Sequence, residues 1–233
     1  LREAGDATPA LMLTTFDEDE AALQATLREH PDAWLVAGGT DAVLEITQQY
    51  AAPAPVIDLS AVAELCAVEE TGAALRVGAA VPYSTLEERF AELSPPLVAM
   101  LERLGSRQIR NRGTLGGNLA NGSPIADMPP VLLAWDATVE VASADGRRRD
   151  VPVEGFHRGY RDTVLEAGEY VAAARIPRAS LARPHRIFKL SKRFEDDIST
   201  VLLALSLELA GDRVGEARVA YGGMAATPLR ATT

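Results

Sequence analysis

Cysteine and histidine are scarce in this sequence. The only cysteine is Cys66, so the chain can form no internal disulfide and cannot build a zinc site or an iron–sulfur cluster from thiolates. The three histidines, His30, His157 and His185, are far apart and form no ligand-like pair, which disfavours a metal site. This cysteine usage is typical of a reducing, cytoplasmic compartment.

Long apolar runs and an excess of basic residues are also missing. No stretch approaches the ~18 consecutive apolar residues of a membrane span, and the first residues lack the pattern of a signal peptide. The net charge of -10 disfavours sequence-independent binding to nucleic-acid phosphates. With 233 residues, 47% of them hydrophobic and 24% charged, the chain is long enough for a sizeable core and has an ordinary globular composition.

Periodic apolar residues predict a mixture of helices and strands. Ser84 and Glu87 form a capping box at the start of one helix, and Asp127 is placed to cap another with prolines in its first turn. Asp145-Gly146 separates two alternating runs, which predicts a hairpin. Further helices are expected over residues 17–30, capped near Asp17, and over residues 97–104. Further strands are expected over residues 33–37, 56–59, 73–78 and 171–178. A second hairpin is expected over residues 198–223.

Two glycine-rich segments indicate a ligand site. Gly38-Gly39-Thr40-Asp41 follows an apolar strand, and Thr114-Leu115-Gly116-Gly117-Asn118 lies further along the chain. Glycine lets backbone N–H groups turn toward a ligand, and consecutive N–H donors bind anions, so two such loops suit a diphosphate. Each segment alone is more typical of a turn. The sequence contains neither a P-loop nor a Rossmann fingerprint.

Nothing in the sequence identifies a nucleophile. Cys66 lies in the apolar stretch AELCAV, which is typical of a strand with a buried, unreactive thiol. Any chemistry is therefore expected from a cofactor. The segment KLSKRFEDD, residues 189–197, carries three cations and three anions, and it fits either an ion-paired surface loop or a charged flap over a redox ring.

Taken together, the chain resembles the FAD-binding domain of the xanthine dehydrogenase family of molybdenum hydroxylases, in its bacterial small-subunit type. The resemblance rests on LVAGGTDA, TLGGNLANGSPIAD, FKLSKRFEDDIS and YGGMAATPLRA, which occur in the family's order and spacing. It implies an α+β fold of the vanillyl-alcohol-oxidase (PCMH) type. The expected parts are a linker at 1–10, FAD-binding subdomains at 11–60 and 61–182, and a truncated C-terminal subdomain at 183–233 of what we expect to be a longer subunit.

The resemblance also implies which residues would hold FAD. One wall of the diphosphate site would be Leu35, Val36, Ala37, Gly38, Gly39, Thr40, Asp41 and Ala42. The opposite wall would be Thr114, Leu115, Gly116, Gly117 and Asn118, acting through backbone N–H groups and the side chains of Thr114 and Asn118. Asp127 would hydrogen-bond the ribose or diphosphate region, the backbone of Val171 would line the flavin site, and Lys189 would contact FAD.

Two further positions follow from the same resemblance. Asp196 would lie on a mobile loop beside the flavin ring that controls the access of NAD, and its carboxylate would disfavour further negative charge there. Leu104 aligns with the position where animal members stack an aromatic ring on the adenine, so this chain would offer only an apolar contact.

The function implied is that of an oxidoreductase module. Electrons from purine (hypoxanthine or xanthine) hydroxylation at molybdenum would pass through [2Fe-2S] clusters to FAD and then to NAD. The clusters would lie on an iron–sulfur domain of the parent chain and the molybdopterin on a large subunit of a cytoplasmic hetero-oligomer. Two alternatives stay open: the flavin subunit of another molybdenum hydroxylase, of aldehyde, carbon monoxide or aromatic-acyl-CoA type, or a non-catalytic scaffold fragment whose glycine segments are turns. NGSPIAD and KLSKRFEDD favour the xanthine type.

Overall fold

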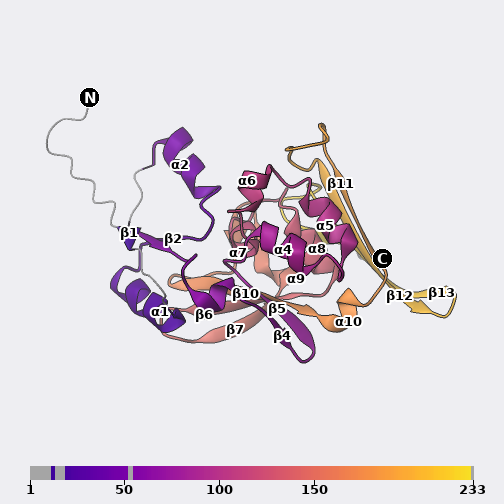
Figure 1. Ribbon diagram of the computed structural model, residues 1–233, viewed down its shortest axis with the longest axis horizontal. Helices are drawn as coiled ribbons and strands as arrows, with labels where there is room; N and C mark the ends of the chain where they lie inside the picture. Colours follow the sequence, from indigo (N-terminus) through magenta and orange to yellow (C-terminus); the bar gives the residue numbers. More distant parts are fainter. Residues whose placement is uncertain (1–11, 14–18, 52–54, 232–233) are drawn as a thin grey trace.

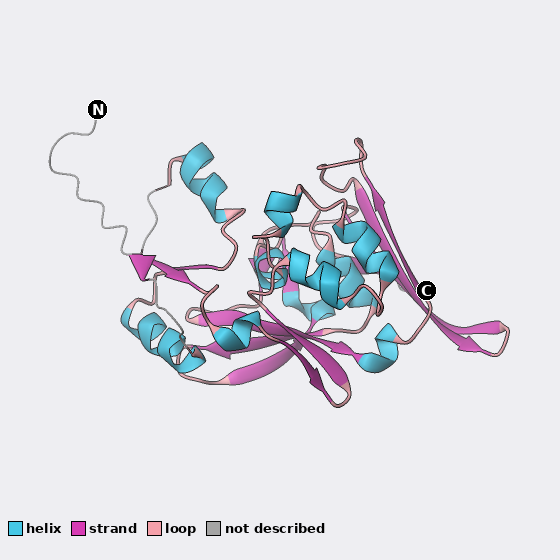
Figure 2. Cartoon of the chain, in the orientation of Figure 1, coloured by secondary structure: helices cyan, strands magenta, loops and turns pink. Residues whose placement is uncertain are grey.

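The computed structural model describes residues 12–13, 19–51 and 55–231 (Figure 1). Three sheets follow one another along the chain, and most helices gather between the second and the third (Figure 2). The prediction of a mixed α+β architecture is therefore confirmed. The predicted linker over residues 1–10 and the predicted cap at Asp17 lie outside the described residues, and the subdomain boundaries stay a prediction.

The first sheet is parallel, with the strand order β1-β3-β2. Its strands are β1 (Met12–Leu13), β2 (Trp34–Val36) and β3 (Val56–Asp58), and its helices are α1 (Glu20–Glu29) and α2 (Ala42–Gln49). Parallel neighbours need a crossover, which α2 provides between β2 and β3. Helix α1 is capped by Asp19 and buries Leu23 and Leu27.

The second sheet is antiparallel, with the order β4-β5-β10-β6-β7. Its strands are β4 (Val68–Thr71), β5 (Ala74–Gly78), β6 (Thr138–Ser143), β7 (Arg148–Pro152) and β10 (Glu169–Pro177). The predicted hairpin at Asp145-Gly146 joins β6 to β7, and Gly146 has a φ of +83° there. A left-handed backbone favours glycine, which is why this turn could be recognised.

The third sheet is a meander in the order β11-β12-β13-β14. Its strands are β11 (His185–Leu190), β12 (Val201–Ala210), β13 (Arg213–Gly222) and β14 (Leu229–Arg230), so the second predicted hairpin is confirmed. Leu202, Ala204 and Ala220 face inward and belong to the main core.

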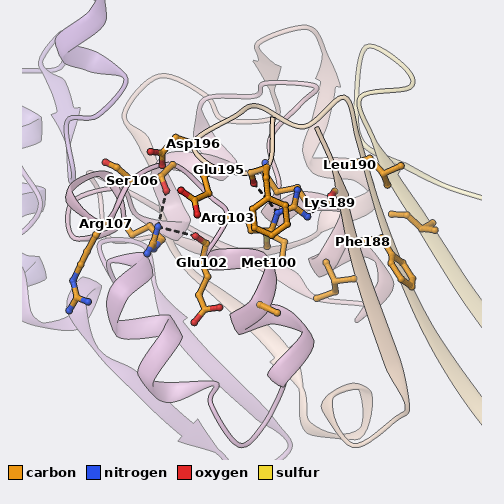
Figure 3. A pocket seen from close by; sticks show the side chains of 16 residues that line it. Met100, Glu102, Arg103, Ser106, Arg107, Phe188, Lys189, Leu190, Glu195 and Asp196 are labelled. Carbon is orange, nitrogen blue, oxygen red and sulfur yellow. Dashed lines mark hydrogen bonds between the residues drawn. The ribbon is translucent and has the colours of Figure 1, made fainter. Parts of the chain in front are cut away.

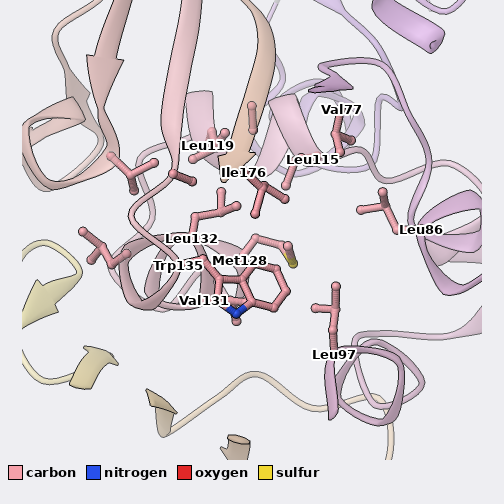
Figure 4. Close-up of a cluster of buried hydrophobic side chains, with 14 of the residues drawn as sticks. Val77, Leu86, Leu97, Leu115, Leu119, Met128, Val131, Leu132, Trp135 and Ile176 are labelled. Atoms are coloured by element: carbon pink, nitrogen blue, oxygen red, sulfur yellow. The ribbon is translucent and has the colours of Figure 1, made fainter. Parts of the chain in front are cut away.

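Most of the short helices lie between the second and third sheets. These are α4 (Tyr83–Arg89), α5 (Pro95–Leu101), α6 (Arg107–Arg110), α7 (Leu115–Ala120), α8 (Met128–Ala134), α9 (Val153–Phe156) and α10 (Arg178–Leu181), with a small pair β8 (His157–Gly159) and β9 (Asp162–Thr163). Helix α3 (Ala63–Cys66) instead contacts α1 and β5. Helix α7 contacts β10, and α8 contacts β12 and β13. The main core around α8 is shown in Figure 4. In this core Trp135 stacks on Phe90, with 6.1 Å between the ring centroids.

Both predicted side-chain caps in this helical region are wrong. Helix α4 begins one residue before Ser84 without a side-chain cap, and Glu87 instead pairs with Arg110 at 2.5 Å. Asp127 is at the N-cap of α8 but makes no capping hydrogen bond, because its carboxylate is held elsewhere. The Oδ1 atom of Asn118 accepts the N–H of Met128 in its place, at 3.2 Å.

Three other local predictions need correction. Cys66 ends the short helix α3 and is exposed, not buried in a strand. Helix α5 ends at Leu101, before Leu104, and Gly105 follows with a φ of +59°. The second glycine-rich segment is the helix α7, not a loop. Among the described helices, none combines the length and apolar character needed to cross a bilayer.

Candidate functional site

The two glycine-rich segments touch each other. A Cβ atom at Gly38 would overlap the carbonyl oxygen of Arg112 and would lie 3.1 Å from the Cα atom of Gly113. A side chain at this position is therefore excluded by backbone, which cannot move aside as a side chain could. Glycine at position 38 is what lets the strand end of the first sheet approach the segment that leads into α7.

A cavity of about 400 Å³ lies between these two segments, and we call it the glycine cavity. It is lined by Leu35, Val36, Ala37, Gly38, Gly39, Thr40, Asp41, Ala42, Tyr83, Leu104, Ile109, Gly113, Thr114, Gly117, Asn118, Ala120 and Asn121. All eight predicted residues of the first wall are present, together with three of the five predicted for the opposite wall. Leu115 instead points into the main core, where it is buried.

A smaller cavity of about 170 Å³ adjoins the glycine cavity, and we call it the apolar cavity. The two share Leu35, Ala37, Gly117 and Ala120 as lining residues. The apolar cavity is also lined by Leu59, Ala79, Gly116, Leu165, Glu169, Tyr170 and Val171. Val171 therefore lines the apolar cavity, whereas Gly38 and Gly39 line the glycine cavity. A polar space next to an apolar one suits a ligand that joins a charged group to a flat ring.

The first glycine segment has free backbone donors. In the stretches that the structure describes, no protein acceptor lies within hydrogen-bond reach of the N–H groups of Gly38, Gly39 and Thr40. Gly39 has a φ of +74°, a left-handed conformation that glycine adopts without strain. Consecutive free N–H groups at such a turn form a concavity that attracts anions. Binding of an anion by this segment stays a prediction.

Four of the five backbone N–H groups of the second glycine segment donate within the protein. The N–H of Leu115 donates to Val81 at 3.3 Å, and that of Gly116 donates to Ala79 at 2.9 Å. The N–H of Gly117 donates to Oγ1 of Thr114 at 3.1 Å, and that of Asn118 to the Thr114 carbonyl at the same distance. The N–H of Thr114 has no protein acceptor in the described residues, so this group and side chains such as the amide NH₂ of Asn118 are left to donate to a ligand.

Gly116 has a packing role that its place in the motif did not reveal. A Cβ atom there would overlap Cβ of Ala79 and would lie 2.7 Å from both Cα and O of the same residue. Helix α7 can lie this close to the end of β5 only because position 116 has no side chain. Gly116 and Ala79 both line the apolar cavity, so their close contact forms part of its wall.

Asp127 and Lys189 form a buried cluster with Ser199. The Nζ atom of Lys189 lies 2.7 Å from Oδ2 of Asp127 and donates to Oγ of Ser199 at 2.8 Å. Ser199 in turn donates to the other carboxylate oxygen of Asp127. The cluster joins β11 to the start of α8. The structure therefore brings Asp127 and Lys189 to each other, and Ser199 was missed because 72 residues separate it from Asp127.

A third cavity of about 1130 Å³, the large cavity, lies between the β11 edge and helices α5 and α6 (Figure 3). It is lined by Ala99, Met100, Glu102, Arg103, Gly105, Ser106, Arg107, Arg110, Ile187, Phe188, Lys189, Leu190, Phe194, Glu195, Asp196 and Leu203. Asp196 is exposed and has a φ of +51°. The structure thus places Asp196 at a different cavity from the two glycine segments.

Residues 102–110 form a partition between two of these cavities. Leu104 and Ile109 line the glycine cavity, whereas Ser106 and Arg107 line the large cavity. Arg103 belongs to this partition and donates to the carbonyl oxygen of Lys189 at 2.8 Å, which holds the segment 189–197 against the partition. Its guanidinium group also lies 4.8 Å from the ring centroid of Phe194.

Tyr83 is a lining residue that sequence reasoning missed. Its side chain is buried, it lines the glycine cavity, and its hydroxyl has no hydrogen-bond partner among the described residues. Burial, and secondarily the charge of Asp127, raise the pKa of the Tyr83 phenol well above its usual value. A tyrosine beside the predicted capping box gives no sequence signal for this position.

The donor set of the site suits an anionic organic group, not a metal ion. No cluster of three or more histidine, cysteine or acidic side chains able to hold a metal occurs in the described part of the chain. Two carboxylates near the first segment share one cation, because Arg161 pairs with Asp41 at 3.8 Å and with Glu45 at 3.3 Å. An anion in the glycine cavity would therefore meet free donors at one wall, while one carboxylate charge of this nearby group stays unmatched.

Comparison with known proteins gives a family for this arrangement. Residues 16–179 match the family described as FAD binding domain in molybdopterin dehydrogenase, and residues 186–233 match the CO dehydrogenase flavoprotein C-terminal domain. The chain is 34% identical over 211 residues to a xanthine dehydrogenase FAD-binding subunit of Escherichia coli O157:H7, covering 88% of this chain and 71% of that protein.

Two further matches define the limits of the comparison. The xanthine dehydrogenase/oxidase of Gallus gallus is 32% identical over 94% of this chain, but the chain spans only 17% of that protein's length. The crystal structure of carbon monoxide dehydrogenase from Hydrogenophaga pseudoflava matches with a TM-score of 0.81 and 30% identity, covering 94% of this chain and 78% of that one.

Proposed function

The chain belongs to the family of FAD-binding domains of molybdopterin dehydrogenases, and from that premise we propose that it holds FAD in the glycine cavity and the adjoining apolar cavity. It would then be the flavin module of a molybdenum hydroxylase, an oxidoreductase. The observation that carries the proposal is that Gly38, Gly39 and Thr40, whose N–H groups have no protein acceptor among the described residues, line a cavity that shares four lining residues with an apolar one.

Each wall has a part in this proposal. The N–H groups of residues 38–40 would bind the diphosphate, and the side chains of Thr114 and Asn118 would meet it from α7. The apolar cavity around Val171 would take the flavin ring and exclude water from it. Leu104 and Ile109 would offer an apolar surface to the adenine. When bound, FAD supplies the redox chemistry by accepting electrons from a donor and passing them to an acceptor.

Asp127 and Lys189 would support the site indirectly. The two side chains neutralise each other at 2.7 Å in a buried position. Neither side chain lines the glycine cavity or the apolar cavity, and the Lys189 ammonium already donates to Asp127 and Ser199. We therefore propose that the pair anchors β11 beside the site, and that direct contact with FAD falls to the cavity-lining groups.

The acceptor is proposed to be NAD, approaching through the large cavity. Asp196 borders that cavity, and the partition 102–110 separates it from the glycine cavity. A carboxylate there would repel an anionic acceptor and so control its access. Replacing Asp196 by Asn in the assembled enzyme should change the rate with NAD, and an unchanged rate and flavin potential would contradict this role.

The parent enzyme is proposed to be a xanthine dehydrogenase that hydroxylates purines. Support comes from NGSPIAD and KLSKRFEDD and from the Escherichia coli and Gallus gallus relatives. An iron–sulfur domain with [2Fe-2S] clusters and a molybdopterin-binding subunit would be its partners. A carbon monoxide dehydrogenase is the second candidate, because residues 186–233 match a domain named after that enzyme and its structure superposes closely.

The test of the proposed function is cofactor uptake by the purified chain. FAD is added to the protein, unbound flavin is removed, and the absorption spectrum is recorded before and after NADH is added without oxygen. We expect a yellow protein that bleaches. A chain that is folded by circular dichroism but retains no FAD would contradict the proposal, and retention of FAD without bleaching would contradict only the choice of NAD.

A further inference from the structure

The first glycine segment is fixed at its start by backbone packing and continues at its end into α2. Gly38 lies so close to Arg112 that a Cβ atom would overlap the carbonyl oxygen of that residue. At the other end, Asp41 is the N-cap of α2, and the carbonyl oxygen of Gly39 accepts the N–H of Val43 in that helix at 3.0 Å. A displacement of α2 would therefore also displace the N–H groups of this segment.

Helix α2 has little apolar packing to hold it in place. None of its residues is buried, and Val43, Leu44 and Ile46 are 52%, 43% and 41% exposed. Figure 1 shows the helix at the margin of the molecule, apart from the helices between the second and third sheets. Helices in proteins are held mainly by the packing of an apolar face, so α2 needs another contact to keep its position.

Arg161 supplies such a contact from the turn between β8 and β9. Its guanidinium group lies 3.3 Å from Oε1 of Glu45 in α2 and 3.8 Å from Oδ2 of Asp41. Within the described part of the chain, no other residue outside α2 forms an ion pair or a side-chain hydrogen bond with this helix. Arg161 is therefore the polar tether between α2 and the rest of the described protein.

The backbone of Arg161 is held in an unusual conformation. Its φ is +53°, in the left-handed region that residues with a side chain rarely adopt. Its N–H donates to the carbonyl oxygen of Gly122 at 3.0 Å, and a Cβ atom at Gly122 would lie 3.0 Å from Cα of Arg161. Gly122 follows Asn121, which lines the glycine cavity just after α7. Arg161 thus joins the end of the α7 wall to α2, and strained residues of this kind gather at functional sites.

We propose that Arg161 is a positioning residue of the glycine cavity. Its pairing with Glu45 and Asp41 holds α2, and with it the N–H groups of residues 38–40, at the distance from α7 that the diphosphate of the ligand requires. The inference rests on the proposed function, because it takes the ligand to be FAD. Arg161 and Glu45 line none of the three cavities, so they act on the ligand through the backbone and not by contact.

Replacing Glu45 by Gln separates positioning from charge. If Glu45 acted on an anionic ligand only through its charge, removal of the carboxylate would tighten the binding of FAD. Positioning predicts the opposite sign: the Kd for FAD should rise about threefold in Glu45→Gln and about fivefold in Arg161→Gln, which loses both carboxylate partners. Titration of the ligand-free protein, followed by flavin fluorescence, gives each Kd. A Kd for Glu45→Gln equal to or below that of the wild type would overturn the inference.

A conservative variant and a matched control sharpen the test. Arg161→Lys keeps a cation for the two carboxylates, so its Kd should return to within about twofold of the wild type. An equal loss in Arg161→Lys and Arg161→Gln would overturn the inference. Arg158→Gln removes the same charge from exposed β8, beside the same turn, and Arg158 lines none of the three cavities. Its Kd should be unchanged, and a rise equal to that of Arg161→Gln would show a general effect of charge and overturn the inference.

Thermal unfolding distinguishes positioning from a purely structural role. The side chain of Arg161 is 43% exposed, and exposed ion pairs contribute little to stability. The thermal midpoint of ligand-free Arg161→Gln should therefore stay within about 3 °C of the wild type. A larger drop would assign Arg161 to the stability of the fold and overturn the inference while leaving the proposed function intact. Failure of the wild-type chain to bind FAD would overturn both.

Discussion

The two glycine-rich segments of this chain have similar composition and opposite uses. At Gly38 and Gly39, which line a cavity, the backbone N–H groups have no protein acceptor among the described residues. At Gly116 and Gly117 the N–H groups donate within the protein. Glycine allows a close backbone contact in both segments, with Arg112 at Gly38 and with Ala79 at Gly116, but it leaves free donors beside the cavity only in the first case. Glycine content alone therefore does not identify a phosphate site, and the decisive question is where the N–H groups donate.

The largest effect on binding is expected from Gly38→Ala. The added Cβ would overlap the carbonyl oxygen of Arg112, so the two walls must separate. We expect the Kd for FAD to rise at least about 100-fold, because the donors of the first wall lose their position. Titration of the ligand-free protein with FAD, followed by flavin fluorescence, measures this change. A Kd within threefold of wild type would show that the walls are not fixed by this contact.

Gly116→Ala is the counterpart in the second segment, and its main effect should be on folding. Its Cβ would overlap Ala79 inside the protein. Overpacking of this kind should lower the free energy of unfolding of the ligand-free chain by about 3 kcal/mol. Urea denaturation measures this loss of unfolding free energy. If this variant instead kept its stability and only lost FAD affinity, the contrast between the two segments would be broken.

A smaller and more selective effect is expected from Gly117→Ala. Its Cβ would lie 3.1 Å from Oγ1 of Thr114, and the position lines both the glycine and the apolar cavity. The methyl group should raise the Kd for FAD about tenfold by taking up ligand space. Stability should be unchanged or higher, because alanine favours a helix over glycine by up to about 1 kcal/mol. A loss of stability similar to that of Gly116→Ala would contradict the separate roles.

Thr114 and Thr40 form a matched pair of positions, at which the expected losses of unfolding free energy are about 1 kcal/mol or less. Thr114 caps α7 by accepting the N–H of Gly117, so Thr114→Ala should lower the free energy of unfolding by about 1 kcal/mol. Thr40 lines the same cavity and has no capping bond in the described structure, so Thr40→Ala should change stability by less than about 0.5 kcal/mol. Equal destabilisation of the two variants in urea would remove this distinction.

The smallest expected effect is a pH dependence of stability that arises at His157, which contacts the second segment. The Nε2 atom of His157 lies 3.0 Å from the carbonyl oxygen of Leu119 in α7. Burial lowers the pKa of His157 below its ordinary value, although this hydrogen bond opposes the shift. His157 therefore binds a proton more readily in the unfolded chain than in the folded chain. The contribution of neutral His157 to the free energy of unfolding is complete above a pH of about 6.5 and is lost as the pH falls.

The measurement is a difference between two proteins. Free energies of unfolding at pH 7.5 and pH 5.5 are compared for the wild type and for His157→Gln, which cancels the titration of the other groups. The wild type should lose more stability than the variant on acidification. Equal losses in the two proteins would show that His157 does not couple α7 to pH.

Local patterns predicted much of the fold. The hairpin at Asp145-Gly146, the long β12–β13 pair and the strand before Gly38 depend on alternation and on turn residues, which neighbouring positions reveal. The helix α7 was not predicted, because glycine disfavours helices and the contact that stabilises it involves Ala79, far away in sequence. Local rules also placed a cap at Asp127, whose carboxylate is held by Lys189, 62 residues away.

The candidate site was predictable only in part. The motifs indicated both walls of the glycine cavity, and comparison with relatives gave the family. They did not indicate that the N–H groups of residues 115–118 donate within the protein, because hydrogen bonds such as Gly116 to Ala79 depend on the packed structure. The position of Tyr83 also needed coordinates, since its unpaired hydroxyl becomes visible only when every buried neighbour is known.

The partition formed by residues 102–110 gives the two cavities a shared boundary. Leu104 and Ile109 face one side, and Ser106 and Arg107 face the other. If a ligand on one side displaced this segment, the space on the opposite side would change and the two binding equilibria would be linked. Linkage is reciprocal: if occupancy of the large cavity alters affinity in the glycine cavity by some factor, occupancy of the glycine cavity alters affinity in the large one by the same factor.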